Sequence, residues 1–218
     1  MTTASLHADR TAGPGRGALV LIASAVVIGL MFIAVAALPY FAPSGESLAR
    51  YAPNGWVLLV HVTTGIVALL IGPYQLWIGL ARKRLPQHRV LGKIYMGAIV
   101  VSSAAAYYLA INTKGGWVFG AGLCGLATAW LITTGMAYAA IRRRLIEQHQ
   151  EWMIRSYVVT FGFVFFRMLF SALEAAEVGT LPERLAASAW FCWSLPLVVA
   201  EAFLQGRKIF HPRPPRVR

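Results

Sequence analysis

Three ionisable side chains lie inside or beside stretches that are otherwise apolar, and they are the first candidates for chemistry. His61 and Arg167 each lie within a long apolar run, and Glu174 follows Arg167 by two helical turns. An ionisable side chain in a membrane-spanning helix costs about 2.5–3.5 kcal/mol on insertion scales, so it normally faces protein, water or a ligand. Gln75 belongs with them because small and polar residues recur at helical steps of three and four at positions 61, 64, 65, 68, 72, 75 and 79.

These residues predict a polar ligand pocket near the outer face, formed by His61, Gln75, Arg167 and Glu174. The alternative is a buried hydrogen-bonded cluster that only fixes helix packing. Arg155 and Glu201 form a separate pair, each near the inner end of its apolar run. Opposite charges at one depth predict an inner ion pair between them.

Two further histidines open apolar runs within similar motifs. The motifs are His88-Arg89-x-x-Gly92-x-x-Tyr95 and His149-x-x-Trp152-Met153-x-Arg155-Ser156-Tyr157. At helix N-termini beside basic residues, they favour a phosphate or an anionic lipid headgroup at the cytoplasmic face. A second interpretation is that His88 and His149 hold the iron of one haem b. The chain has no CxxC, HExxH or GxSxG pattern, so the sequence names no other metal site and no catalytic residue.

The elements that position these residues are long apolar helices. Of the 218 residues, 58% are hydrophobic and only 13% charged, which argues against a soluble domain. A bilayer core about 30 Å thick needs about 20 residues of apolar helix. Runs of this length occur at 17–41, 55–80, 91–112, 117–141, 152–175 and 185–204. The sequence therefore predicts an all-α polytopic transmembrane bundle of about six spans over 17–205, between polar tails at 1–16 and 206–218.

The distribution of basic residues predicts the orientation of this bundle. The chain has 20 Lys and Arg against 8 Asp and Glu, a formal charge of +12. With the N-terminus in the cytoplasm, 16 of the 20 fall on the inner side, three on the outer side, and Arg167 within a span. This bias follows the positive-inside rule, so we expect both termini to be cytoplasmic, in a bacterial inner membrane. It also explains the charge without nucleic acid as a partner.

The motifs are similar to those of a known family. His61-x-x-x-Gly65 and Gly72-Pro73-x-Gln75, with the two histidine motifs above, resemble the bacterial predicted membrane proteins called domain of unknown function 2306. The resemblance extends to near Glu201 and implies a multi-helix inner-membrane protein. It implies no catalytic residue.

Three functions stay open, and with them the question of whether the chain is an enzyme. The first is a membrane redox component that binds haem or quinone. The second is a transporter or receptor for a small anionic or amphipathic molecule, with Arg167 as the charge clamp and His61 as a proton-coupled partner. The third is a non-catalytic assembly partner whose polar helix face docks another membrane protein.

Overall fold

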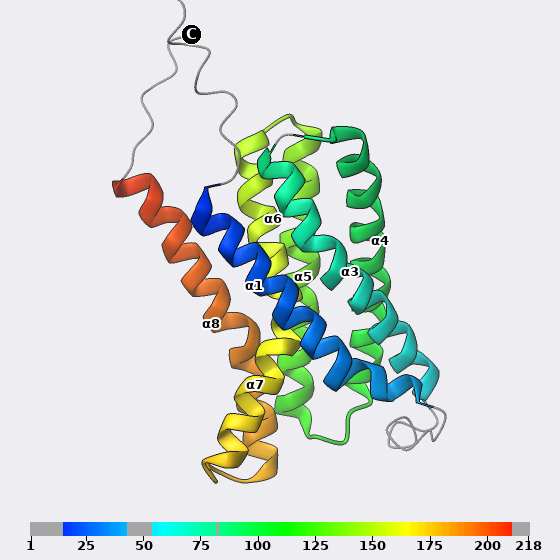
Figure 1. The fold of residues 1–218 in the computed structure, drawn as a ribbon. Coiled ribbons are helices and arrows are strands. Elements are labelled where there is room, and N and C mark those ends of the chain that lie inside the picture. The colour runs from blue at the N-terminus through cyan, green and yellow to red at the C-terminus, as the bar shows by residue number, and fades with distance from the viewer. Residues whose placement is uncertain (1–14, 43–53, 82, 211–218) are drawn as a thin grey trace, which may run out of the picture. The chain divides into compact units, whose positions relative to one another are not determined.

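The computed structural model describes residues 15–42, 54–81 and 83–210, and within these ranges the chain is helical, with no strand. The elements are α1 Arg16–Phe32, the π-helix η2 Ile33–Ala37, the 3-10 helix η3 Leu38–Phe41, α3 Gly55–Ala81, α4 Leu85–Ile111, α5 Trp117–Arg142, α6 Ile146–Thr160, α7 Gly162–Ala175 and α8 Leu181–Phe210 (Figure 1).

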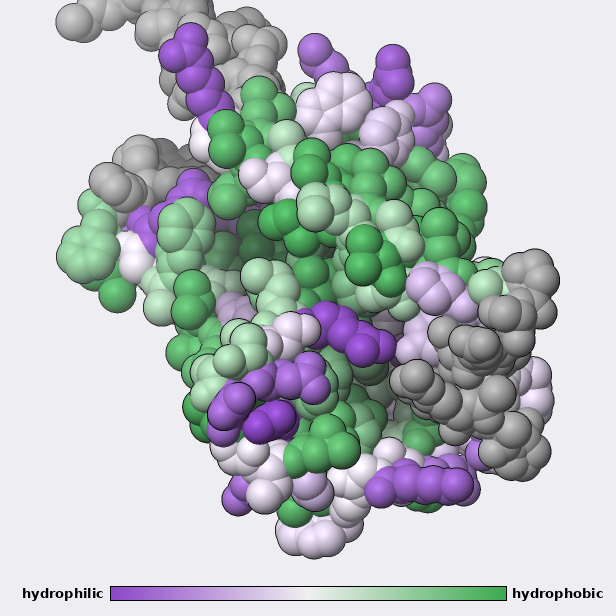
Figure 2. Space-filling view, turned by 60° about the horizontal axis from the view of Figure 1, so that its bottom comes forward, coloured by the Kyte–Doolittle hydropathy of each residue, from purple (hydrophilic) through white to green (hydrophobic). Residues whose placement is uncertain are grey.

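Five helical segments of the described chain are long and apolar enough to cross a membrane. They are α3, α4, α5, α8 and the continuous stretch Arg16–Phe41, and α6 with α7 makes a sixth if this bent pair is one span. Figure 2 shows apolar residues over much of the surface in view and hydrophilic residues in smaller separate patches. The predicted all-α bundle of about six spans is confirmed. The predicted tails at 1–16 and 206–218 lie mostly outside the described residues, although α8 continues to Phe210.

The fifth predicted span is not the single helix expected over 152–175. Its helix ends at Thr160 and a new one begins at Gly162, with a bend of 41° between their axes. Glycine is a weak helix former, which favours a break at this point. Gly162 also lies where a Cβ would be 2.8 Å from Leu126 Cδ1, so the break occurs at a tight contact with α5.

Helix ends differ from the ends of the apolar runs. α4 begins at Leu85, six residues before the predicted 91, and α8 extends over 181–210 where 185–204 was expected. Polar residues continue these helices beyond their apolar part, so hydropathy marks the membrane-spanning portion and not the helix end. In the first span, Pro39 has no N–H for the helical ladder, and the chain passes there from π to 3-10 geometry.

The chain divides into two compact units, Met1–Ser102 and Ser103–Arg218, with the boundary inside α4. In the first unit α1 packs on α3, where a Cβ on Gly29 would lie 3.5 Å from Leu69 Cγ. In the second unit α5 contacts both α6 and α8, and α7 packs on α8. Close contact between α5 and α8 is possible because Gly122 faces Ala189, whose side chain is fully buried.

Candidate functional site

In the first unit, α3 and α4 interlock through a polar side chain from each helix. Gln75 Nε2 donates to His88 O at 2.9 Å, and a Cβ on Gly92 would lie 3.1 Å from the same nitrogen. Conversely, a Cβ on Gly79 would lie 3.3 Å from His88 Cε1. Each helix therefore offers a glycine to the polar side chain of the other. Gln75, predicted as part of a ligand pocket, is 3% exposed and holds this hairpin together.

His61 also joins α3 to α4. Its Nδ1 lies 3.0 Å from both Ser102 O and Ser102 Oγ, and Ser102 Oγ donates to His61 O at 3.1 Å. Because the Ser102 hydroxyl donates its proton to His61 O, Nδ1–H of the imidazole is the donor toward Ser102. In this tautomer Nε2 carries the ring lone pair. His61 and Gln75 are thus on the predicted small and polar face of α3, and that face packs against α4.

The loops before α4 and α6 share a local design. Arg84 and Arg144 precede the two helices with positive φ of 52° and 60°, a conformation that non-glycine residues rarely adopt. His88 and His149 are each the fourth residue of the helix that follows. Both histidines precede the apolar runs predicted at 91–112 and 152–175, but the helices begin earlier than these runs and include the histidines. Their backbone N–H groups already donate inside the first turn, to Arg84 O at 3.1 Å and to Leu145 O at 2.9 Å.

His149 is held against the preceding helix of its own unit. Its Nδ1 lies 2.9 Å from Ala137 O on α5, so the ring donates this proton to the carbonyl and keeps the lone pair on Nε2. A carbonyl that fixes the tautomer in this way is typical of histidines that bind metals through the other nitrogen. His88 lies in the first unit and His149 in the second. Their predicted joint role as haem ligands stays a prediction.

The predicted inner pair, Arg155 and Glu201, is in direct contact in the second unit. Arg155 is 7% exposed, its Nε donates to Glu201 Oε2 at 2.7 Å, and a second guanidinium nitrogen lies 2.5 Å from the same oxygen. The guanidinium also stacks 4.8 Å from the Trp152 ring centroid. Glu151 lies 3.9 Å away and is bound in turn by Lys208 at 2.8 Å. This network fastens α6 to α8, which makes it a structural element.

A second set of contacts between α5 and α6, made by hydroxyl groups, was not predicted from the sequence. Thr134 Oγ1 lies 2.7 Å from Ser156 Oγ, and Trp130 Nε1 donates to Thr160 Oγ1 at 2.9 Å. Hydroxyl residues are common in membrane helices, where they also bond to their own backbone, so their spacing alone does not reveal their partners.

The polar residues of α7 are exposed. Arg167, Ser171 and Glu174 lie one and two helical turns apart, and all three are accessible on the surface of α7. The opposite side carries an aromatic ladder in which Phe166 stacks on Phe170 with an interplanar angle of 7°. This polar face is exposed in the second unit. The predicted pocket, in which Arg167 and Glu174 join His61 and Gln75 of the first unit, stays a prediction.

The described residues contain no group of three or more His, Cys, Asp and Glu side chains that could hold a metal ion. The best candidate site for a ligand is therefore the α7 face. Arg167 supplies a cation there, Ser171 a hydroxyl and Glu174 a carboxylate.

Comparison with known families agrees with this architecture. A family described as a predicted membrane protein, DUF2306, matches residues 58–204. The chain belongs to this family. All eight predicted site residues, from His61 to Glu201, lie in the matched segment of the DUF2306 member, whereas α1 and the last turns of α8 lie outside it. No curated protein and no solved structure matches the chain.

Proposed function

We propose that this DUF2306 member is a multi-pass protein of a bacterial inner membrane with both termini in the cytoplasm. The support is the distribution of basic residues, 16 of which fall on the inner side in this orientation. Arg142 at the end of α5 and Arg143 and Arg144 in the loop that follows lie on the inner side in this orientation, whereas the loop between α4 and α5 carries only Lys114.

Cysteine labelling tests this orientation. A membrane-impermeant maleimide should label Lys114→Cys in intact cells and should label Arg143→Cys only after the cells are opened, because both positions are exposed in short loops. Unsubstituted protein gives the background from Cys124 and Cys192, which lie within spans. The reverse labelling pattern would overturn the proposed orientation.

We further propose that the α7 face binds a small anionic or amphipathic molecule, so that the protein acts as a transporter or receptor. One observation carries this proposal: Arg167 is exposed on a helix whose residues are mostly apolar. A charged side chain that faces lipid raises the free energy of membrane insertion by about 2.5–3.5 kcal/mol. Membrane proteins retain such a charge where it serves a ligand or an ion pathway. Arg167 lies five residues after Gly162, about 8 Å from the start of α7.

The break between α6 and α7 supports the same function. Membrane transporters often bind their substrates at discontinuous helices, where backbone groups and helix ends are freed from the regular ladder. Here the α6–α7 span bends by 41° at Phe161, six residues before Arg167. Arg167 is thus close to a position where the span can change its bend.

A redox component remains the second candidate, because the bond from His149 Nδ1 to Ala137 O presents Nε2 as a ligand nitrogen. In that function His88 and His149 are the proposed haem b ligands, or they face a quinone. The third candidate, an assembly partner, would cover the same α7 face with another membrane protein.

Analysis of what co-purifies with gently solubilised protein separates these functions. We expect mass spectrometry of the denatured extract to detect an anionic small molecule with the wild type and at least tenfold less with Arg167→Gln, because one charge-assisted contact contributes about 1.5–3 kcal/mol. Arg143→Gln, an exposed arginine outside the spans, is the matched control and should retain the molecule.

Each other outcome selects against the anion-binding function. A Soret band that shifts on dithionite reduction favours the redox candidate, and a stoichiometric second protein favours the assembly candidate. Equal amounts of the anion with the wild type and Arg167→Gln would remove Arg167 as the clamp.

A further inference from the structure

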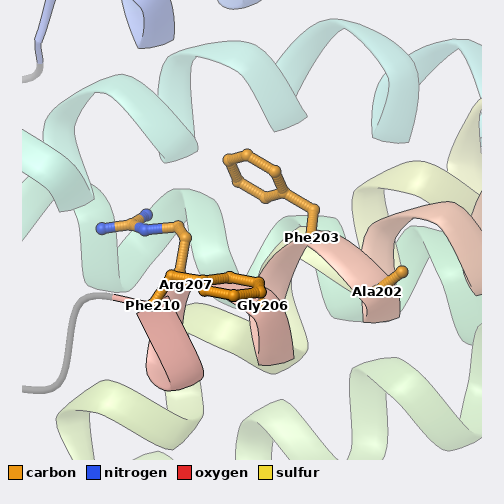
Figure 3. A pocket seen from close by; sticks show the side chains of 5 residues that line it. All are labelled: Ala202, Phe203, Gly206, Arg207 and Phe210. Atoms are coloured by element: carbon orange, nitrogen blue, oxygen red, sulfur yellow. The ribbon is translucent and has the colours of Figure 1, made fainter.

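The C-terminal turns of α8 contain a hollow of about 250 Å³, and three of its five lining residues lie beyond the family match, which ends at residue 204. Its lining residues all come from α8, and they are Ala202, Phe203, Gly206, Arg207 and Phe210 (Figure 3). Ala202 and Gly206 are four residues apart and form a floor without bulky side chains. Phe203 and Arg207, also four apart, form one wall, and the Phe210 ring lies beside Gly206 (Figure 3). The hollow is therefore a shallow, open depression on one face of α8, largely apolar, with a cation at its rim.

One basic side chain, Arg207, lies at the rim of the hollow. The Arg207 guanidinium lies 6.0 Å from the Phe203 ring centroid, and within the described ranges no carboxylate pairs with it. Residues 202–218 contain five basic residues and no acidic one. Charge complementarity at this end of α8 thus requires an anionic partner.

We propose that this hollow binds one anionic phospholipid, with the phosphate on Arg207 and an acyl chain over Gly206. The order of the residues matches such a lipid, because Phe203 and Ala202 lie one turn before Arg207, about 6 Å deeper in the membrane. Arginine binds phosphate through two parallel N–H donors. The aromatic walls give the acyl chain apolar contacts, which a free phosphate would not use.

The leaflet follows from the proposed orientation, in which the end of α8 is cytoplasmic. The cytoplasmic leaflet carries anionic lipids, and basic residues near it gain about 1 kcal/mol each, roughly a fivefold change in binding. The lipid site can be tested apart from ligand binding at α7, because its residues are on another helix.

Native mass spectrometry of the detergent-solubilised full chain tests the site with two probes, phosphatidylglycerol and phosphatidylcholine. When lipid is titrated, we expect the first lipid molecule to bind the wild type more tightly than the next. At this tight site we expect phosphatidylglycerol to be preferred to phosphatidylcholine. Arg207→Gln should weaken phosphatidylglycerol about fivefold and weaken phosphatidylcholine less, because the cationic choline group already offsets the charge of its phosphate. Arg143→Gln removes the same charge from another exposed position and should leave both affinities unchanged.

Gly206→Leu tests the hollow without changing the charge. A Cβ at Gly206 would meet only Phe210 Cδ2, at 4.0 Å, so a larger side chain fits on the helix surface and fills the floor. We expect Gly206→Leu to weaken both lipids at the tight site. Inorganic phosphate at millimolar concentration should not displace the lipid.

Several results would overturn the proposal. Equal losses with Arg207→Gln and Arg143→Gln would show a general charge effect, and an unchanged Gly206→Leu variant would show that no acyl chain occupies the hollow. Displacement by inorganic phosphate would identify a simple anion site. Loss of the α7 ligand in Arg167→Gln would leave the lipid affinities of the α8 site unchanged. The proposals of ligand binding at α7 and of lipid binding at α8 can therefore fail separately.

Discussion

Glu201→Met is expected to lower the free energy of unfolding by about 2 kcal/mol, because it leaves the buried Arg155 charge with only Glu151 nearby, at 3.9 Å. Removing one partner of a fully buried pair costs about 3–5 kcal/mol. The Glu201 side chain is 45% exposed, so water weakens the pair and the expected loss is smaller. Arg155→Met should cost less, since water can hydrate the half-exposed Glu201 that remains.

The double variant distinguishes a buried charge from lost packing. Arg155→Met with Glu201→Met removes both charges and keeps apolar volume, and it should be more stable than Glu201→Met alone. Unfolding by dodecyl sulfate in mixed micelles, followed by far-ultraviolet circular dichroism, measures these differences. Arg143→Met is the control and should change stability by less than about 0.5 kcal/mol. A Glu201→Met variant as stable as this control would show that the pair contributes nothing.

The Arg155–Glu201 contact shows which part of a site a membrane sequence can reveal. Few charges occur in apolar spans, so two opposite charges near the inner ends of two helices leave few alternatives for pairing. The number of spans follows for a similar reason, because bilayer thickness sets the length of each apolar run. Both predictions depend on composition and depth along single helices.

The interlocked α3–α4 hairpin depends on contacts that composition does not encode. The stripe from His61 to Gly79 predicts a face that packs against protein, and α4 covers that face. It does not predict that Gly92 receives Gln75 or that Gly79 receives His88, because these pairings require the register between two helices. The break at Phe161 was missed in the same way, since the tight contact of Gly162 with Leu126 comes from another helix. Two of the residues assigned to a ligand pocket from the sequence, His61 and Gln75, thus have packing partners on α4.

The contact between α5 and α8 gives the second large expected effect. Gly122→Leu should lower the free energy of unfolding by about 3 kcal/mol, because overpacking a tight contact forces the neighbouring backbone to move. Even one Cβ at this position would lie 2.9 Å from Ala189 Cβ and 3.1 Å from Ala189 C. The second of these is a backbone atom, which no rotamer change can displace. Gly122→Ala should therefore also destabilise, by about 1–2 kcal/mol.

Gly135 on the same helix supplies the matched control. A Cβ there would meet nothing within 4 Å, so Gly135→Ala should be neutral or stabilising by up to about 1 kcal/mol through helix propensity. Adding Ala189→Gly to Gly122→Ala removes the Cβ that clashes and should recover part of the loss, measured by the same unfolding assay. If Gly122→Ala and Gly135→Ala behave alike, α5 and α8 do not approach each other as closely as the structure has them. Partial recovery by Ala189→Gly would instead locate the clash at this crossing, where the helices meet through Gly122 and Ala189.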